Sequence, residues 1–159
     1  MLFSRARSFP VIRPLRTEKA EDCARLHGAS FAYPWSAEEM AALIANASTL
    51  AAAALDPASG RLRGFVLARL AADEAEILTV AVEPSTRGKG VGRALLAESL
   101  RQAARAGART MFLEVDQDNA AALALYGRLG FVKVGERTGY YRRKDGQPAT
   151  AIIMLKALP

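Results

Sequence analysis

The chain has 159 residues, of which 51% are hydrophobic and 24% are charged, and its formal net charge at pH 7 is +6. This length and apolar content suit one globular core, so we expect residues 1–159 to form a single domain. No apolar run approaches the ~18 residues of a membrane-spanning helix. The one cysteine, Cys23, excludes an internal disulfide, and together with His27 it supplies too few ligands for a zinc site. We therefore expect a cytoplasmic protein without a bound metal.

The positive charge is spread along the chain rather than gathered in one segment. Residues 1–8 carry Arg5 and Arg7 but lack the apolar stretch of a signal peptide, so we expect a frayed arm there. The one local cluster, Arg142-Arg143-Lys144, precedes a predicted turn and is typical of a solvated hairpin. We therefore expect no direct nucleic-acid binding and no membrane contact. The charge would still attract a polyanionic cofactor, or a partner bound to RNA.

Hydrophobic periodicity and turn residues predict alternating strands and helices. Strands are expected over 9–15, 49–55, 63–70, 76–82, 110–115, 131–134, 140–142 and 151–155. Helices are expected over 17–29, 36–46, 91–106 and 119–129. Together they predict a mixed α/β sheet of six or seven strands, antiparallel at first and joined in the middle through a right-handed crossover helix.

Polar residues at the starts of three predicted helices can cap the helix N-termini. Thr17 and Asp118 are expected to cap the first and last helices, while Ser36 and Glu39 form a capping-box pattern at the second. The segment 110–115 is apolar at nearly every position, so we expect a central strand that is buried on both faces.

Residues 80–93 contain the most informative pattern, an apolar strand that runs through Glu83-Pro84 into a glycine-rich turn and an amphipathic helix. Glycines let the backbone turn tightly and approach a ligand, and the helix start presents free N–H groups to an anion. The spacing RxxGxG is neither GxxxxGK[ST] nor GxGxxG, which disfavours a nucleotide triphosphatase and a dinucleotide site. A solvated turn without a ligand is the alternative. The residues expected to surround a pyrophosphate are Arg87, Gly88, Lys89, Gly90, Val91, Gly92 and Arg93.

Two segments carry a family resemblance. Arg87-Gly88-Lys89-Gly90-Val91-Gly92 resembles the pyrophosphate loop of the GNAT superfamily of acyl-CoA-dependent N-acyltransferases. The segment 119–126, followed by Leu129-Gly130-Phe131, is similar to the second motif of that superfamily. The resemblance is clearest over 77–134 and implies a GNAT-like sheet, splayed in the middle, with about four helices on both faces.

Within that superfamily the chain is most similar to the bacterial ribosomal-protein alanine N-acetyltransferases, the RimI-type enzymes. The similar segments are Tyr33-Pro34-Trp35-Ser36, Leu113-Glu114-Val115, Tyr140-Tyr141 and Ile152-Ile153-Met154. Three features depart from that group: Gly88 replaces a commonly basic residue, Ala149-Thr150 stands where an acidic pair is usual before the last strand, and the N-terminal arm is longer.

The resemblance implies acetyl-CoA as cosubstrate and direct transfer of its acetyl group to a protein N-terminal α-amine. A ribosomal protein is the implied partner, and we expect a monomer or weak homodimer. The backbone of Val80, Ala81 and Val82 is expected to pair with the pantetheine arm and the thioester. The alternatives are an acetyltransferase for small amines or lysine side chains and, in another class, a non-catalytic CoA-binding or RNA-associated module.

Acetyl transfer requires a neutral amine, and an α-amine with a pKa of about 7.7–8 needs less help from a base than a lysine at about 10.4. Glu114 ends an apolar strand whose burial would raise its pKa, so it is the candidate base; an exposed structural carboxylate is the alternative. Tyr126 is the candidate acid for the leaving thiolate, or else a core residue. Asn119 can hydrogen-bond the helix start, contact the pantetheine arm, or do both.

Four aromatic residues are expected to flank the acceptor, on connections and terminal strands away from the glycine-rich loop. They are Tyr33, Trp35, Tyr140 and Tyr141. Aromatic side chains there could pack against a peptide backbone. The alternative is that Trp35 packs at the entry to the second helix and that one tyrosine of the pair faces the core.

Overall fold

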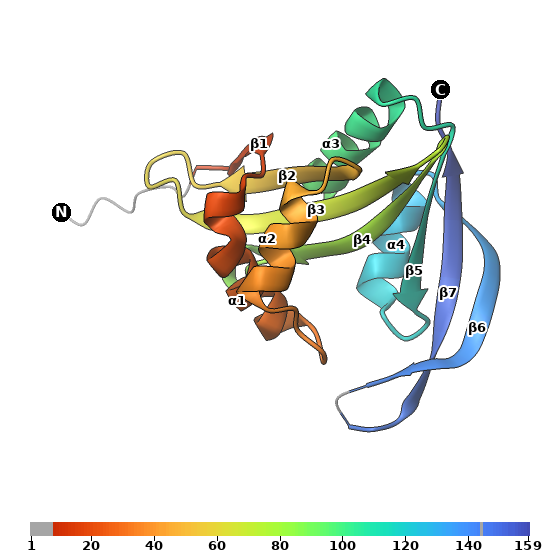
Figure 1. The fold of residues 1–159 in the computed structure, drawn as a ribbon. Coiled ribbons are helices and arrows are strands. Elements are labelled where there is room, and N and C mark those ends of the chain that lie inside the picture. The colour runs from red at the N-terminus through yellow and green to blue at the C-terminus, as the bar shows by residue number, and fades with distance from the viewer. Residues whose placement is uncertain (1–7, 144) are drawn as a thin grey trace.

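The computed structural model describes residues 8–143 and 145–159, which fold as a seven-stranded mixed sheet with helices on both faces (Figure 1). The strand order is β1-β2-β3-β4-β5-β7-β6. The strands are β1 (Val11–Pro14), β2 (Thr49–Leu55), β3 (Leu62–Ala71), β4 (Glu74–Val82), β5 (Thr110–Asp116), β6 (Val132–Arg142) and β7 (Pro148–Ala157). The α-helices are α1 (Ala20–Ser30), α2 (Ala37–Ala45), α3 (Val91–Arg105) and α4 (Ala120–Arg128). Two 3-10 helices are η1 (Thr17–Lys19) and η2 (Pro84–Thr86).

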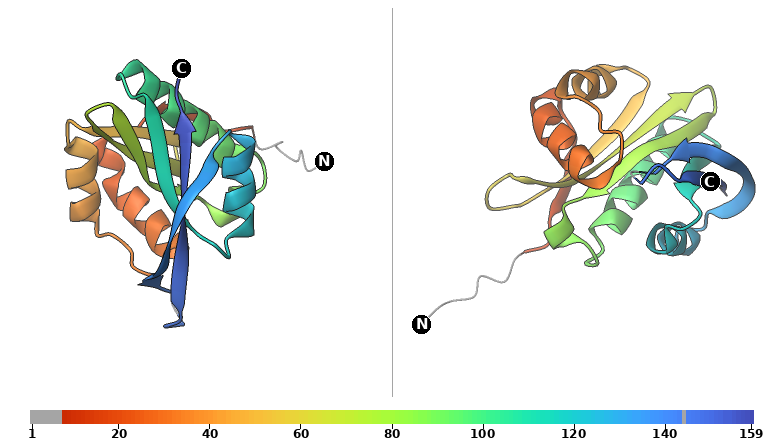
Figure 2. Two further views of the ribbon diagram at one scale, coloured as in Figure 1. Left: turned by 90° about the vertical axis from the view of Figure 1, so that its right-hand side faces the viewer. Right: turned by 90° about the horizontal axis from the view of Figure 1, so that it is seen from below.

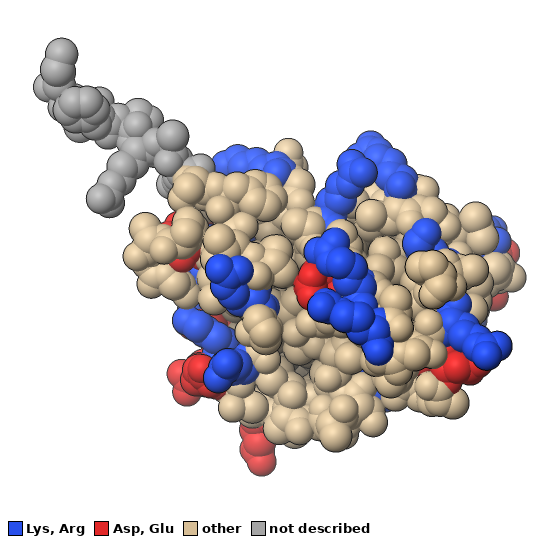
Figure 3. Space-filling view, turned by 90° about the horizontal axis from the view of Figure 1, so that it is seen from above, with Lys and Arg blue, Asp and Glu red and all other residues tan. Residues whose placement is uncertain are grey.

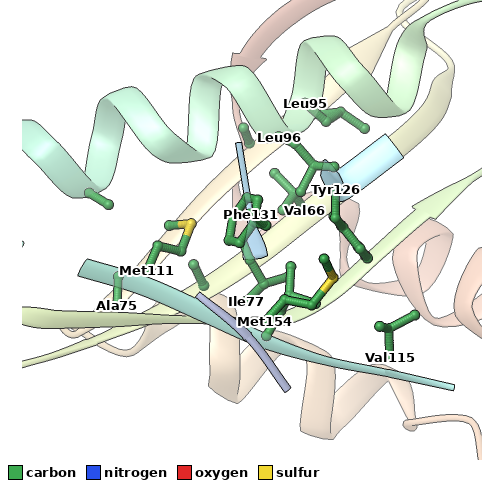
Figure 4. Packing of buried hydrophobic residues seen from close by; sticks show 14 of the residues in the cluster. Val66, Ala75, Ile77, Leu95, Leu96, Met111, Val115, Tyr126, Phe131 and Met154 are labelled. Atoms are coloured by element: carbon green, nitrogen blue, oxygen red, sulfur yellow. The ribbon is translucent and has the colours of Figure 1, made fainter. Parts of the chain in front are cut away.

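The helices form two layers, with α1 and α2 on one face of the sheet and α3 and α4 on the other (Figure 2). Alternation along the strands creates two cores: Ala53 faces α1 and α2, whereas its neighbours Ala52 and Ala54 face α3. Figure 4 shows the core beneath α3, where Leu95 and Leu96 lie over the sheet. The expected mixed sheet with helices on both faces is confirmed.

The sheet is interrupted between its two halves. The parallel strands β4 and β5 pair only over 74–76 and 110–112, at their amino ends. Beyond this point the two strands diverge, as Figure 1 shows. From Ile77 onward, β4 therefore has no strand partner on its β5 side within the described structure. The expected splay in the middle of the sheet is confirmed.

A β-bulge in β4 lies just beyond the last β4–β5 pair. Leu67 and Ala68 of β3 are opposite Thr79 and Ile77, so Leu78 is the extra, unpaired residue. A bulge bends its strand and increases the local twist, and this one begins where β4 turns away from β5.

The capping-box prediction is confirmed, because Ser36 Oγ accepts from the Glu39 N–H at 3.1 Å and Glu39 accepts from the Ser36 N–H at 2.9 Å. The two other predicted caps are wrong. Thr17 starts a 3-10 helix, and α1 begins at Ala20 without a side-chain cap. At α4 the cap is Asn119, one residue after the predicted Asp118.

Three predictions for the second half of the sheet are wrong. β5 is buried on one face only, because its alternate side chains stay partly exposed. The segments 131–134 and 140–142 belong to one strand, since β6 continues through irregularities in its register. Ala149 and Thr150 lie inside β7 and not before it.

None of the helices in the described ranges is long and apolar enough to cross a membrane.

Gly64 marks a close approach between β3 and β4 that should tolerate no side chain. A Cβ there would lie 2.9 Å from the Ala81 carbonyl oxygen. We expect Gly64→Ala to lower the free energy of unfolding by about 1–3 kcal/mol, because backbone must move to accept the methyl group. Urea denaturation measures this.

The matched control is Gly28→Ala on α1, where the new Cβ would lie 3.6 Å from its nearest neighbour, an ordinary contact. Helix propensity predicts a change of less than about 1 kcal/mol in the stabilising direction. Equal losses in both variants would contradict the close-approach argument.

Candidate active site

The glycine-rich loop connects the end of β4, through η2, to the start of α3. Gly88 and Gly90 have φ values of +75° and +87°, a left-handed conformation that side chains other than glycine rarely adopt. Gly90 is the residue that precedes α3. Gly92 is different: it lies inside the helix, where a Cβ would lie 3.6 Å from Leu125. The loop thus has the shape of an anion site at a helix N-terminus.

Two cations of the loop, Arg87 and Lys89, donate hydrogen bonds within the structure. Arg87 donates from Nε to the Val82 carbonyl at 3.0 Å and from Nη2 to Ser30 Oγ at 3.1 Å. Lys89 Nζ donates to the Ser85 carbonyl at 3.3 Å. Arg93 lies exposed in the first turn of α3. The guanidinium of Arg87 thus ties the loop to α1 and keeps further donors free to meet a phosphate.

A carboxylate also lies at this turn, and its charge is compensated. Glu83 Oε2 accepts from Arg63 Nη1 at 2.6 Å, and Arg61 pairs with its other oxygen. Burial opposes ionisation of Glu83, but these two arginines outweigh it and lower the pKa of the carboxyl. The network anchors the loop and limits the repulsion that Glu83 would exert on a bound pyrophosphate.

The open edge of β4 presents backbone groups beside this loop. The Glu83 N–H donates to the Arg63 carbonyl, so residues 81 and 83 direct their N–H and C=O groups toward β3. Alternation in an antiparallel ladder then directs the groups of Val80 and Val82 toward the splay. Of the three residues expected to pair with a cosubstrate, Ala81 is therefore turned away.

Glu114 lies on β5, on the face opposite α3 and α4. Its side chain is 22% exposed, and Oε1 lies 3.3 Å from Arg137 Nη1 of β6. The prediction that apolar neighbours enclose it is wrong, because Leu113 and Val115 point to the other face and join the core beneath α3. The ion pair with Arg137 holds the Glu114 carboxylate on this face of β5.

Tyr126 lies on α4 and is 7% exposed, so the structure bears out its packing in the core. Its ring meets the ring of Phe131 edge-on, with centroids 5.9 Å apart, and Figure 4 shows the two side chains together under α3. Burial raises the pKa of Tyr126 to about 12. At neutral pH the phenol is therefore protonated and able to donate.

Asn119 performs one of its two expected tasks. Its Oδ1 accepts from the Ala122 N–H at 3.1 Å, which fixes the first turn of α4. Tyr126 follows later on the same helix, so this cap also helps to set the position of the phenol.

The aromatic residues of the α1–α2 connection differ in exposure. Tyr33 is 67% exposed. Trp35 stacks on His27 with ring centroids 4.5 Å apart, and the backbone N–H of Trp35 donates to His27 Nδ1 at 3.2 Å. Trp35 thus packs at the entry to α2, as the alternative predicted. Tyr140 and Tyr141 belong to β6, but their side chains lie outside the described residues.

No local pattern in the sequence indicates the role of Arg143, which lies between β6 and β7. Its guanidinium makes two 2.8 Å hydrogen bonds to Asp116 at the end of β5 and lies 2.7 Å from Asp118. The prediction of a solvated basic hairpin is therefore wrong at this residue. These ion pairs fasten the hairpin to the end of the strand that carries Glu114.

Two hollows in the surface are not lined by the glycine-rich loop, Glu114 or Tyr126. A hollow of about 440 Å³ lies between Leu50, Gln102 and Arg105, and one of about 300 Å³ borders β1. Among the described residues no group of three or more His, Cys, Asp or Glu could hold a metal ion. Figure 3 shows several separate groups of basic side chains on the face seen from above, with acidic side chains beside some of them.

The chain belongs to the acetyltransferase (GNAT) family, whose sequence profile matches residues 20–131. It is thus an N-acetyltransferase of the GNAT type with the fold of that family. Over 101 residues it is 41% identical to the [Ribosomal protein bS18]-alanine N-acetyltransferase of Escherichia coli K12, a match that spans 64% of this chain and 66% of that protein.

Solved structures agree with this assignment. The crystal structure of the ribosomal-protein-S18-alanine N-acetyltransferase from Escherichia coli matches with a TM-score of 0.84 at 32% identity, covering 93% of both chains. Arabidopsis thaliana NAA60 in complex with acetyl-CoA matches with a TM-score of 0.82 at 23% identity, covering 92% of this chain and 97% of that chain. This second likeness concerns the fold.

Replacing Gly90 should separate cosubstrate binding from folding. We expect Gly90→Val to abolish acetyl-CoA binding in calorimetric titration, because a β-branched residue cannot adopt φ +87° and would enter the space for phosphate. Gly60→Val is the control, since Gly60 has φ +71° in a turn with open space around it. Binding that survives in Gly90→Val would overturn the loop assignment.

Proposed function

We propose that this enzyme transfers the acetyl group of acetyl-CoA directly to the α-amine of a protein N-terminus, with a ribosomal protein that begins with alanine as acceptor. The single observation that carries the proposal is the splay, which sets the open edge of β4 and the glycine-rich loop on one side of a gap and Glu114 on the other. The similarity to a ribosomal-protein alanine N-acetyltransferase supports the acceptor class.

Residues around the splay have complementary tasks in this proposal. The N–H groups at the start of α3, with Arg87, Lys89 and Arg93, bind the pyrophosphate. The backbone of Val80 and Val82 pairs with the pantetheine arm, and an N–H of this edge stabilises the oxyanion. Tyr33, with Tyr140 and Tyr141, lines the acceptor side. The 159 residues act as one domain in the cytoplasm, with no metal and with a protein N-terminus as the partner.

Glu114 as the base and Tyr126 as the acid account for both proton transfers of the reaction. Glu114 accepts a proton from the acceptor ammonium, and the neutral amine then attacks the thioester carbon. As the C–N bond forms and the C–S bond breaks, Tyr126 donates its proton to the sulfur and regains one from the new amide nitrogen. One proton thus passes to Glu114 and then to solvent, and the other passes from nitrogen to sulfur.

Acceptor competition tests the proposal. We would compare a peptide that begins with alanine, a lysine-containing peptide with a blocked N-terminus, and a free polyamine, and locate the acetyl group by mass spectrometry. The α-amine should be acetylated fastest. Faster reaction of lysine or polyamine would overturn the N-terminal assignment, and cosubstrate binding without transfer to any amine would indicate a non-catalytic module.

Tyr126→Phe should lower kcat by about 10² to 10⁴ and leave acetyl-CoA affinity nearly unchanged. The substitution removes a proton donor but keeps the ring that packs on Phe131. Steady-state kinetics and calorimetry measure the two quantities. An equal loss of affinity would instead assign the hydroxyl to binding.

Glu114→Gln should produce a defect that depends on pH. The amide cannot accept the proton, but an alkaline solution supplies neutral amine without a base, so the ratio of wild-type to variant kcat/KM should fall as pH rises from 7 to 9. A ratio that stays constant over this range would assign Glu114 a positioning role.

A further inference from the structure

Thr79 carries a buried hydroxyl that the reaction described above does not use. The residue is 5% exposed, and its Oγ1 is buried without a hydrogen-bond partner in the described part of the chain. A buried polar group without a partner destabilises a fold, and a valine of nearly equal shape would avoid the cost. The hydroxyl therefore requires an explanation.

The register of the sheet shows which way Thr79 points. Its β3 partner is Leu67, which belongs to the core under α1 and α2. Residues directly opposite each other in an antiparallel pair share a face. The next residue, Val80, packs instead against the core under α3. Thr79 therefore faces the α1 and α2 side of the sheet, which is also the side of Glu114.

Thr79 and Glu114 also lie at the same height along their strands. The last β4–β5 pair is Glu76 with Phe112. Thr79 follows Glu76 by three residues, but Leu78 has no partner in β3, so Thr79 lies two pairing positions beyond Glu76 in the ladder. Glu114 likewise lies two residues beyond Phe112 on β5. Thr79 and Glu114 thus lie on the same face of the sheet and at corresponding positions on the two sides of the splay.

We propose that the Thr79 hydroxyl holds the water molecule through which Glu114 takes the proton of the acceptor amine. This inference rests on the proposed function. The ammonium gives a proton to the water while the water gives one to the Glu114 carboxylate, and Thr79 accepts and donates hydrogen bonds without a net change. Because Oγ1 is buried in the structure, presenting the hydroxyl to this water requires a rotation about χ1.

The charged groups on the Thr79 side of the sheet are held in ion pairs, and the titratable groups of α1 are buried. On this face Glu76 is paired with Arg69, Glu114 with Arg137, and Asp116 with Arg143. From α1, burial lowers the pKa of His27 below its usual 6.5 and raises the pKa of Cys23 to about 12. The shifts of His27 and Cys23 both move their titration away from the range between pH 7 and 9, in which the acceptor amine changes its charge.

The test compares Thr79→Val, Thr79→Ser and Ser99→Ala. Ser99 on α3 is the matched control, because its hydroxyl is also buried and unpartnered among the described residues but lies in the other core layer. We expect Thr79→Val to lower kcat with an alanine-terminated peptide about 10-fold at pH 7, by less at pH 9, and to leave KM for acetyl-CoA unchanged. Thr79→Ser should restore the rate, and Ser99→Ala should not change it.

Thermal unfolding separates this role from a structural one. Both Thr79→Val and Ser99→Ala should keep or raise the Tm, since each removes an unpartnered buried hydroxyl. A Thr79→Val enzyme with unchanged kcat at every pH, a defect independent of pH, or a lowered Tm would overturn the inference. Failure of the wild-type protein to acetylate the peptide would instead overturn the proposed function, so the two failures are distinguishable.

Discussion

The rest of the structure depends on the loss of pairing between β4 and β5 after three residues. Parallel strands in the middle of a sheet normally remain bonded along their length, because unpaired backbone in a protein interior is costly. Here β4 bulges at Leu78 and turns away, and the backbone groups of Val80 and the Val82 N–H become available to an extended ligand, whereas the Val82 carbonyl accepts from Arg87. One interruption of regular structure thus creates both a gap for a thioester and an edge that can bind its amide-rich arm.

The elements around that gap are fastened by ion pairs that cross between strands and loops. Arg63 joins the β2–β3 turn to Glu83 at the start of the glycine-rich loop, and Arg143 joins the β6–β7 turn to the end of β5. These pairs are only partly exposed, so solvent and salt screen them less than surface pairs. These ion pairs hold the residue that follows β4 and the end of β5 in place, so the unpaired edge of β4 keeps its conformation.

Local patterns in the sequence predicted one of the three helix caps and most of the strands and helices. The Ser36–Glu39 box and the left-handed glycines follow from chemistry within a few residues, and the sheet with its two helix layers follows from periodicity. The Arg143–Asp116 pair spans 27 positions, and no nearby residue indicates it. The predicted environment of Glu114 is wrong because a continuous apolar run predicts burial on both faces, whereas β5 buries only alternate residues. The bulge depends on the pairing of two strands and has no sequence signature of its own.

The burial of Cys23 has a practical consequence for measuring turnover. Its side chain has no solvent exposure, and burial raises its pKa to about 12, so the thiolate that reacts with disulfide reagents is nearly absent in the folded protein. The chain contains no other cysteine. Colorimetric detection of the free thiol of released CoA can therefore run continuously without background from the enzyme, and any slow reaction of the protein itself would report its unfolding.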